Sequence, residues 1–328
     1  MRSYLLHRLV WTVPVLLAIS LVTFVLMHLV PGGPWDQHKQ LAPSVVENLN
    51  RRYNLDKPGW EQYLLFLGGA VRGDLGVSYT NQDRPVAAVI LEGLPATATL
   101  GVCAVLLALV AGVSVGTLAA VKQNSMVDYV TLTFATVGAS VPSIVSGIVL
   151  IIVFALGLHW FPTGGWQPPQ PAWDALVAGR FGDVGPALWS FVSRAVLPVC
   201  ALALLPAALL ARVTRASVLE VFRQDYVRTA RAKGLGEVAI ANRHVLKNAL
   251  IPIITVAGPV AADLVTGSFI VESIFGIPGV GRTFVQGVSA RDYALILGST
   301  LFYTVTIVFA NLVVDVLYAV VDPRVRYG

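Results

Sequence analysis

Charged residues are scarce in this sequence. Asp, Glu, Lys and Arg make up 12% of its 328 residues, whereas a soluble globular chain carries about 25%. The hydrophobic share is 56%, and the mean hydropathy is +0.73. The composition therefore excludes an ordinary soluble globular protein and predicts an integral membrane protein. The net charge of +5 does not indicate a nucleic-acid partner, because the basic residues cluster between apolar stretches, as topology signals do.

Cysteine is nearly absent, and so is any nucleotide-binding signature. Cys103 and Cys200 both lie in apolar stretches, so we expect two small packing residues and neither a disulfide framework nor a metal site. No Gly-Lys pair occurs in the sequence. A P-loop needs glycines that expose backbone N–H groups and a Lys that binds phosphates. We therefore expect a chain that binds no cofactor and does not hydrolyse ATP by itself.

Long hydrophobic stretches are abundant. A helix that crosses the hydrocarbon core of a bilayer needs about 20 apolar residues. Six stretches meet this requirement, and they comprise residues 9–30, 96–121, 127–159, 191–211, 250–270 and 294–320. The first and the third are both long and strongly apolar. The sequence predicts an all-α membrane protein with six transmembrane helices and an extracytoplasmic loop region after the first.

The first stretch follows Arg2 and Arg8, as the apolar core of a signal peptide would. Its apolar run is longer than the roughly 7–15 residues of such a core, and no small-residue cleavage site follows it. We expect residues 1–30 to form the N-terminus and an uncleaved first transmembrane helix.

The distribution of Lys and Arg predicts the orientation. With a cytoplasmic N-terminus, the inside segments hold 13 basic residues. The outside segments hold 10 when Arg194, near the outer end of its span, is counted with them, although they are together about twice as long. Positive charge is retained on the cytoplasmic side of a membrane. Both termini, including a tail at 321–328, should therefore face the cytoplasm.

The polar region 31–95 should lie outside the cytoplasm. It contains a helix-like stretch at 60–67, whose apolar residues could pack on the bundle or on the membrane surface. Two interpretations stay open: a small cap over the ends of the spans, or a docking surface for a soluble partner. The remaining residues, 96–320, should form a five-helix core that includes a cytoplasmic region at 212–249.

The basic region 212–249 has the pattern of a short docking helix. Asp225 is a candidate N-cap, and Gly234 can adopt the left-handed conformation that ends a helix. The residues between them are mostly small or basic: Arg228, Thr229, Ala230, Arg231, Ala232 and Lys233. Such a helix fits a groove of another protein, whereas a topology signal alone needs neither small residues nor a glycine stop. A second helix should lead through Arg243 and Lys247 into the fifth span.

Residues 228–234 resemble the cytoplasmic coupling motif of binding-protein-dependent ABC importer permeases. That motif reads Glu-Ala-Ala, three residues, then Gly. Ala230 and Gly234 match it, whereas Arg228 and Thr229 replace the Glu and the first Ala. The sequence of residues 226–234 resembles the variant of this motif found in the dipeptide and oligopeptide branch of the family. Further segments resemble the same branch along nearly the whole chain, namely 55–58, 62–63, 72–76, 94–97, 271–275, 278–281, 291–293 and 322–324.

The resemblance implies a division of labour. It implies the type I (MetI-like) ABC importer permease fold in a bacterial cytoplasmic (inner) membrane. In that family the permease pairs with a second homologous subunit, and the resemblance favours a different chain in that place. Two cytoplasmic ATPases carry ATP and Mg, and an extracytoplasmic binding protein delivers the substrate. The residues implied to contact the ATPase are Tyr226, Arg228, Thr229, Ala230, Arg231, Ala232, Lys233 and Gly234. The substrates of the family include dipeptides, longer peptides, glutathione and nickel chelates.

An intramembrane protease and a secondary transporter are the two alternatives to an ABC importer permease. Six-span serine proteases use a Gly-x-Ser-Gly site with a His in a later span, but Ser146-Gly147 follows Ile144-Val145 and no His lies in the last three spans. A secondary transporter driven by an ion gradient remains an alternative, because Asp263 and Asp315 could serve as ion or proton sites.

Three acidic residues lie within or beside the spans. Asp263 and Asp315 are costly in lipid and should face the interior of the bundle, where they contact substrate or make packing hydrogen bonds, Asp315 with Asn311. Glu272 is a candidate residue of an external gate. Three prolines inside the spans should bend them, and these are Pro142, Pro198 and Pro206.

Overall fold

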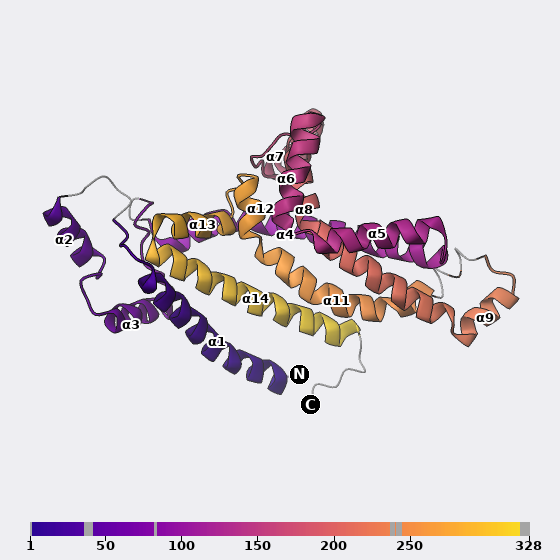
Figure 1. Ribbon diagram of the computed structural model, residues 1–328, viewed down its shortest axis with the longest axis horizontal. Coiled ribbons are helices and arrows are strands. Elements are labelled where there is room, and N and C mark those ends of the chain that lie inside the picture. The colour runs from indigo at the N-terminus through magenta and orange to yellow at the C-terminus, as the bar shows by residue number, and fades with distance from the viewer. Residues whose placement is uncertain (1, 36–41, 82–83, 237–239, 241–244, 322–328) are drawn as a thin grey trace. The chain divides into compact units, whose positions relative to one another are not determined.

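The computed structural model describes residues 2–35, 42–81, 84–236, 240 and 245–321 (Figure 1). These residues form helices, apart from turns, irregular segments and one isolated antiparallel bridge between Val77 and Pro85. The helices are α1 (Arg2–Leu29), α2 (Pro43–Arg52), α3 (Gly59–Ala70), α4 (Val86–Val121), α5 (Met126–Ser140), α6 (Ser143–Leu150), the π-helix η1 (Ile151–Gly157), α7 (Gln170–Val177), α8 (Phe181–Phe222), α9 (Asp225–Ala232), α11 (Leu246–Thr266), α12 (Phe269–Ile274), α13 (Val280–Ala290) and α14 (Tyr293–Val321).

Five helical stretches are long and apolar enough to cross a membrane, and a bent helix pair brings the number to six. The five are Val10–Leu29, Val86–Val121, Phe181–Phe222, Pro252–Ile274 and Tyr293–Val316. The all-α membrane fold is therefore confirmed. Helices α4 and α8 extend well beyond the predicted stretches 96–121 and 191–211, because the helices continue through isolated charged residues and prolines such as Glu92, Pro95 and Pro186.

The predicted third span, 127–159, is not a single helix. Helices α5 and α6 with η1 together pass as a span, but they are bent by 109° at a short break. Val141 adopts an extended conformation with ψ of 119°, because the ring of the following Pro142 disfavours a helical residue before it. The predicted bend at Pro142 is thus confirmed. Pro198 and Pro206, in contrast, lie within the continuous helix α8.

The described residues fall into two compact units. The first unit combines Met1–Pro95 with Pro278–Phe309. Its apolar core contains Phe24, Met27, Ile296 and Leu297, against which aromatic residues of α3, α13 and α14 pack. Asp292 is fully buried before α14 and accepts hydrogen bonds from Leu295 N and Ser78 Oγ, at 3.1 and 2.6 Å.

The second unit combines Ala96–Ile277 with Ala310–Arg326. Glycines of α4 allow this helix to approach two neighbours closely. A Cβ at Gly116 would lie 2.4 Å from the carbonyl oxygen of Ala211 in α8, and a Cβ at Gly101 would lie 2.4 Å from that of Leu264 in α11. Small residues at such crossings permit close packing of helix backbones in membrane proteins. Helix α8 therefore forms the long central element against which α4, α5 and α11 are arranged.

Candidate functional site

The short helix α9 begins directly after the long helix α8. The backbone N–H groups of Val227 and Arg228 donate to the carbonyl of Gln224, at 3.1 and 3.3 Å. The helix starts at Asp225 itself, so the prediction that Asp225 caps the helix from outside is wrong by one residue. Its carboxylate lies in the first turn, where the helix dipole favours a negative charge.

The end of α9 agrees with the sequence. The helix ends at Ala232, and Lys233 N still donates to the carbonyl of Thr229 at 3.1 Å. Gly234 has φ of +81°, which is the left-handed conformation that glycine adopts at little cost after a helix. The predicted glycine stop is confirmed.

One edge of α9 is anchored within the chain. Val227 is fully buried, with 0% of its surface accessible to solvent, and Ala230 is buried as well. Both pack in an apolar cluster with Ala120 of α4 and with Val218 and Phe222 of α8. Sequence reasoning did not single out Val227, although an apolar pair at i and i+3 is the signal of a buried helix edge.

The hydroxyl of Tyr226 makes a polar contact to the start of α11. It accepts a hydrogen bond of 2.7 Å from Nδ2 of Asn248. Together with the apolar cluster, this contact holds α9 against α8, α4 and α11.

The opposite face of α9 is exposed. Arg228, Thr229, Ala232, Lys233 and Gly234 are all accessible in this chain. Arg228 lies 3.7 Å from the carboxylate of Asp225, and both side chains are largely exposed, so this pair contributes little to stability. The side chain of Arg231 lies outside the described residues, as do the predicted Arg243 and the side chain of Lys247. The structure thus places Ala230 inside the chain and the other described members of the set on an accessible basic surface.

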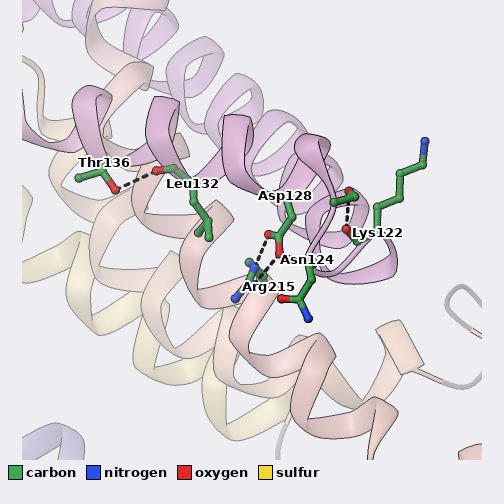
Figure 2. Close-up of polar contacts among 7 residues, drawn as sticks. Lys122, Asn124, Asp128, Leu132, Thr136 and Arg215 are labelled. Atoms are coloured by element: carbon green, nitrogen blue, oxygen red, sulfur yellow. Dashed lines mark hydrogen bonds and ion pairs between the residues drawn. The ribbon is translucent and has the colours of Figure 1, made fainter.

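A partly buried salt bridge joins α5 to α8 (Figure 2). Arg215 Nε donates to Asp128 Oδ1 at 2.6 Å, and Arg215 Nη2 donates to Asp128 Oδ2 at 2.7 Å. The N–H of Asn124, a residue with φ of +60°, also donates to Oδ2 at 2.9 Å. The sequence did not predict this pair, because the two residues are 87 positions apart and neither segment contains a motif that indicates contact with the other.

The three intramembrane acids occupy different environments. Glu272 lies in α12, is fully buried and accepts a hydrogen bond of 3.0 Å from Thr97 Oγ1. Asp315 is half-buried in α14, whereas Asp263 is exposed on α11. We expected Asp263 to face the interior of the bundle, and within this chain it does not. An exposed face of one subunit can be covered by another, which a single sequence does not reveal.

The region 31–95 contains the predicted helix at 60–67, as α3. Neither α2 nor α3 contains a fully buried residue. A cavity of about 350 Å³ lies in this unit, lined by residues that include Arg52, Tyr53, Asp74 and Tyr79. Burial, with the negative charge of Asp292, raises the pKa of Tyr79, so its hydroxyl stays protonated at physiological pH.

Neither a metal centre nor a disulfide is indicated by the described residues. No group of three or more His, Cys, Asp or Glu among them could hold a metal ion. Cys103 and Cys200 are both free and half-buried, in agreement with packing roles.

Two family models match the chain. Residues 112–327 match the model described as binding-protein-dependent transport system inner membrane component. Residues 1–101 match the N-terminal model of the same kind of membrane component. Together the two models cover nearly the whole chain.

Curated relatives match over their full length. The oligopeptide transport system permease protein OppB of Salmonella typhimurium is 39% identical over 327 residues, covering 100% of both chains. The OppB protein of Haemophilus influenzae is 38% identical over 328 residues, again with 100% coverage of both. The dipeptide transport system permease protein DppB of Bacillus subtilis is 36% identical over 326 residues, covering 99% of this chain and 98% of that protein.

A solved structure shares the fold. A chain of the inward-facing MetNI methionine ABC transporter matches with a TM-score of 0.54 and 17% identity, covering 72% of this chain and 97% of that one. This likeness confirms the predicted MetI-type permease fold. The family places the chain in the inner membrane as a multi-pass permease component without an ATPase domain, in a system that uses ATPase subunits and a binding protein. The chain therefore belongs to the family of binding-protein-dependent transport system inner-membrane components.

Proposed function

We propose that this chain forms one half of the translocation pathway of an ATP-driven importer of short peptides. The observation that carries the proposal is α9, a helix anchored by Val227 and Ala230 that presents an accessible basic face. Relatives of 36–39% identity that bear the names of oligopeptide and dipeptide permeases support peptides as the substrate class.

Helix α9 is the coupling helix in this proposal. Its exposed residues Arg228, Thr229, Ala232 and Lys233 contact a groove of an ATPase subunit, and the sequence motif predicts a contact of Arg231 as well. Ala230 and Tyr226 hold the helix on the permease, and Gly234 ends it. Closure of the two ATPases then moves α9 and, through it, α8 as a rigid body.

The topology follows from the positive charges. Residues 212–249 and both termini face the cytoplasm, and residues 31–95 lie outside. The lack of fully buried residues in α2 and α3 favours a docking surface for the binding protein over a passive cap. The domain organisation remains an outer region at 31–95 and a membrane core at 96–320.

A second permease subunit, different in sequence from this one, completes the pathway. Asp263 is exposed in this chain, and an exposed carboxylate in lipid is costly. Contact with the second subunit or with the aqueous pathway removes that cost. Asp315 is a second candidate for the pathway, whereas Glu272, being fully buried, acts on a gate through Thr97 and the packing of α12.

Reconstitution tests the proposal. The permease pair, the ATPases and the binding protein are placed in proteoliposomes, and uptake of a radiolabelled tripeptide is measured. Uptake should require both ATP and the binding protein. Uptake driven by an ion gradient without ATP would instead support a secondary transporter. Uptake of a nickel chelate or glutathione with no peptide uptake would overturn the substrate assignment.

A further inference from the structure

The Asp128–Arg215 salt bridge engages both oxygens of a buried carboxylate. Asp128 is 1% exposed, and both of its oxygens accept from the forked guanidinium of Arg215 (Figure 2). A bidentate pair of this kind defines both the distance and the relative orientation of the two side chains. The additional hydrogen bond from Asn124 N connects the turn between α4 and α5 to the same carboxylate.

Away from this salt bridge, small residues of α5 pack closely against α8. The buried residues of α5 are Asp128, Ala135 and Gly138, and the latter two have almost no side chain. A Cβ at Gly138 would be 3.5 Å from Leu204 of α8, which is ordinary contact. A cavity of about 260 Å³ lies between α4, α5 and α8, with Val130 and Phe134 in its wall. The charged pair adds a directional contact between the first turn of α5 and α8, which small apolar side chains cannot provide.

The salt bridge lies between two elements that matter for transport. Arg215 is on the last two turns of α8, and α9 starts at Asp225, directly after α8 ends at Phe222. Asp128 is on α5, whose far end is the 109° break before α6. Beyond that break, Ala155 of η1 packs in a cluster with Ala201 of α8 and Phe275. One path of direct contacts thus leads from α9 through α8 and the salt bridge to the broken span.

We infer that Asp128 and Arg215 are positioning residues for coupling, which transmit a displacement of α9 to α5 and so to the break at Pro142. The inference rests on the proposed role of α9. Without the salt bridge, α8 could slide along α5 when α9 moves, because the remaining contacts of α5 are made by small side chains that form no directional bond. ATP hydrolysis would then continue, but fewer substrate molecules would be transported per ATP hydrolysed.

Physical considerations favour coupling over mere stability as the purpose of this pair. The desolvation of the buried Asp128 and the partly buried Arg215 offsets part of their attraction, and neutral replacements of such a pair are often no less stable. Removing one partner, in contrast, leaves an uncompensated buried charge. Neutral variants of similar shape, D128N and R215M, together in one chain, therefore keep the fold while they abolish the directional contact.

The test compares ATP hydrolysis with peptide uptake in the reconstituted complex. The double variant D128N/R215M should assemble with the ATPases and hydrolyse ATP, while tripeptide uptake per ATP hydrolysed falls by about tenfold, a factor typical of lost coupling between sites. The exchanged pair D128R/R215D should recover part of that ratio, because it restores an ion pair. The control is D183N, which removes an exposed pair with Arg180 at the other end of α8, with atoms 3.8 Å apart, and should leave the ratio unchanged.

Three results separate the inference from its premise. An unchanged uptake-to-ATP ratio in D128N/R215M would overturn the inference, and so would loss of assembly with the ATPases, which would show a structural role only. The premise is tested separately, by charge reversal on α9 in a chain that keeps the salt bridge. If the ATPases still bound that variant, the proposed role of α9 would be wrong, and this conclusion would not depend on the salt-bridge variants.

Discussion

Gly234 and Gly236 lie two residues apart after α9 but differ in conformation. Gly234 has φ of +81°, whereas Gly236 is not among the residues with positive φ, and a Cβ at either position would meet no atom within 4 Å. A β-branched residue at Gly234 opposes the left-handed turn at a cost on the order of 1 kcal/mol. We expect G234V to insert normally but to lower peptide uptake, because the helix end is displaced from the ATPase.

The matched control is G236V, which introduces the same side chain without the conformational penalty. Uptake and membrane levels of both variants are measured in the same cells. Equal uptake by G234V and G236V would show that the left-handed turn is not needed for coupling.

Gly267 separates α11 from α12 and is constrained in two ways. Its φ is +96°, and a Cβ would lie 2.4 Å from Thr97 Cγ2 and 2.7 Å from Glu272 Oε1. We expect G267A to destabilise the protein by on the order of 2 kcal/mol, the usual cost of overpacking, and to disturb the Thr97–Glu272 hydrogen bond. The thermal unfolding midpoint of detergent-purified protein measures the loss.

Gly185 provides the comparison for this variant. It lies in α8 with open space around it, so G185A should be neutral or slightly stabilising, as expected for alanine in a helix. A G267A protein as stable as G185A would mean that the junction between α11 and α12 relaxes at no cost.

At the scale of the helix, α9 is the element on which coupling depends. Charge reversal of Arg228 and Arg231 should weaken binding of the ATPase subunits, because both residues belong to the proposed contact surface. The side chain of Arg228 is highly exposed, so its replacement should not unfold the helix. Co-purification of the ATPases with R228E/R231E measures the effect, with R180E at the opposite end of α8 as the control. Equal recovery of ATPases with both variants would contradict the assigned surface.

The sequence predicts α9 well because its signals are local. Small residues, basic residues and Gly234 all lie within one short segment, and their meaning does not depend on the rest of the fold. The break at Pro142 was also predictable, since the ring of proline restricts its predecessor. The angle of 109° was not, because it depends on how α6 and η1 pack against residues far away in the sequence.

The salt bridge between Asp128 and Arg215 shows the limit of local reasoning. From the sequence alone, Asp128 is an acidic residue at the start of a span. Arg215 is one of several positive charges that retain a loop in the cytoplasm. Only the packing of α5 on α8 brings them to 2.6 Å. The exposure of Asp263 on α11 likewise depends on tertiary packing, which the local sequence does not reveal.

At the scale of the whole molecule, the orientation in the membrane is open to direct measurement. We expect T229C, on the exposed face of α9, to react with a membrane-impermeant thiol reagent only from the cytoplasmic side. V71C, at a residue that is 89% exposed, should react only from outside. The parent chain for both has Cys103 and Cys200 replaced. Labelling of T229C from outside, or no labelling of V71C from outside, would contradict the six-span topology.

The last prediction concerns how selectively the pathway itself binds a peptide. Both ends of a peptide are charged, so a tight site would need a cation for the carboxylate. Of the six predicted transmembrane stretches, only 191–211 contains a Lys or Arg, namely Arg194, and its guanidinium already donates to Ser190 Oγ at 3.0 Å. Arg215, farther along α8, is held by Asp128. Selection should therefore reside in the binding protein, while the pathway makes weak contacts that let the substrate leave.

We expect the permease pair with its ATPases, in nanodiscs without binding protein, to bind a tripeptide more weakly than about 1 mM, which corresponds to a binding free energy of about −4 kcal/mol. Isothermal titration with the intact complex measures it, and addition of the binding protein provides the positive control. Binding on the order of micromolar would refute weak recognition, because it requires a cation for the carboxylate that this half of the pathway does not offer. If that tight binding then disappeared on neutralising a basic residue of the second permease, the missing cation would be located there.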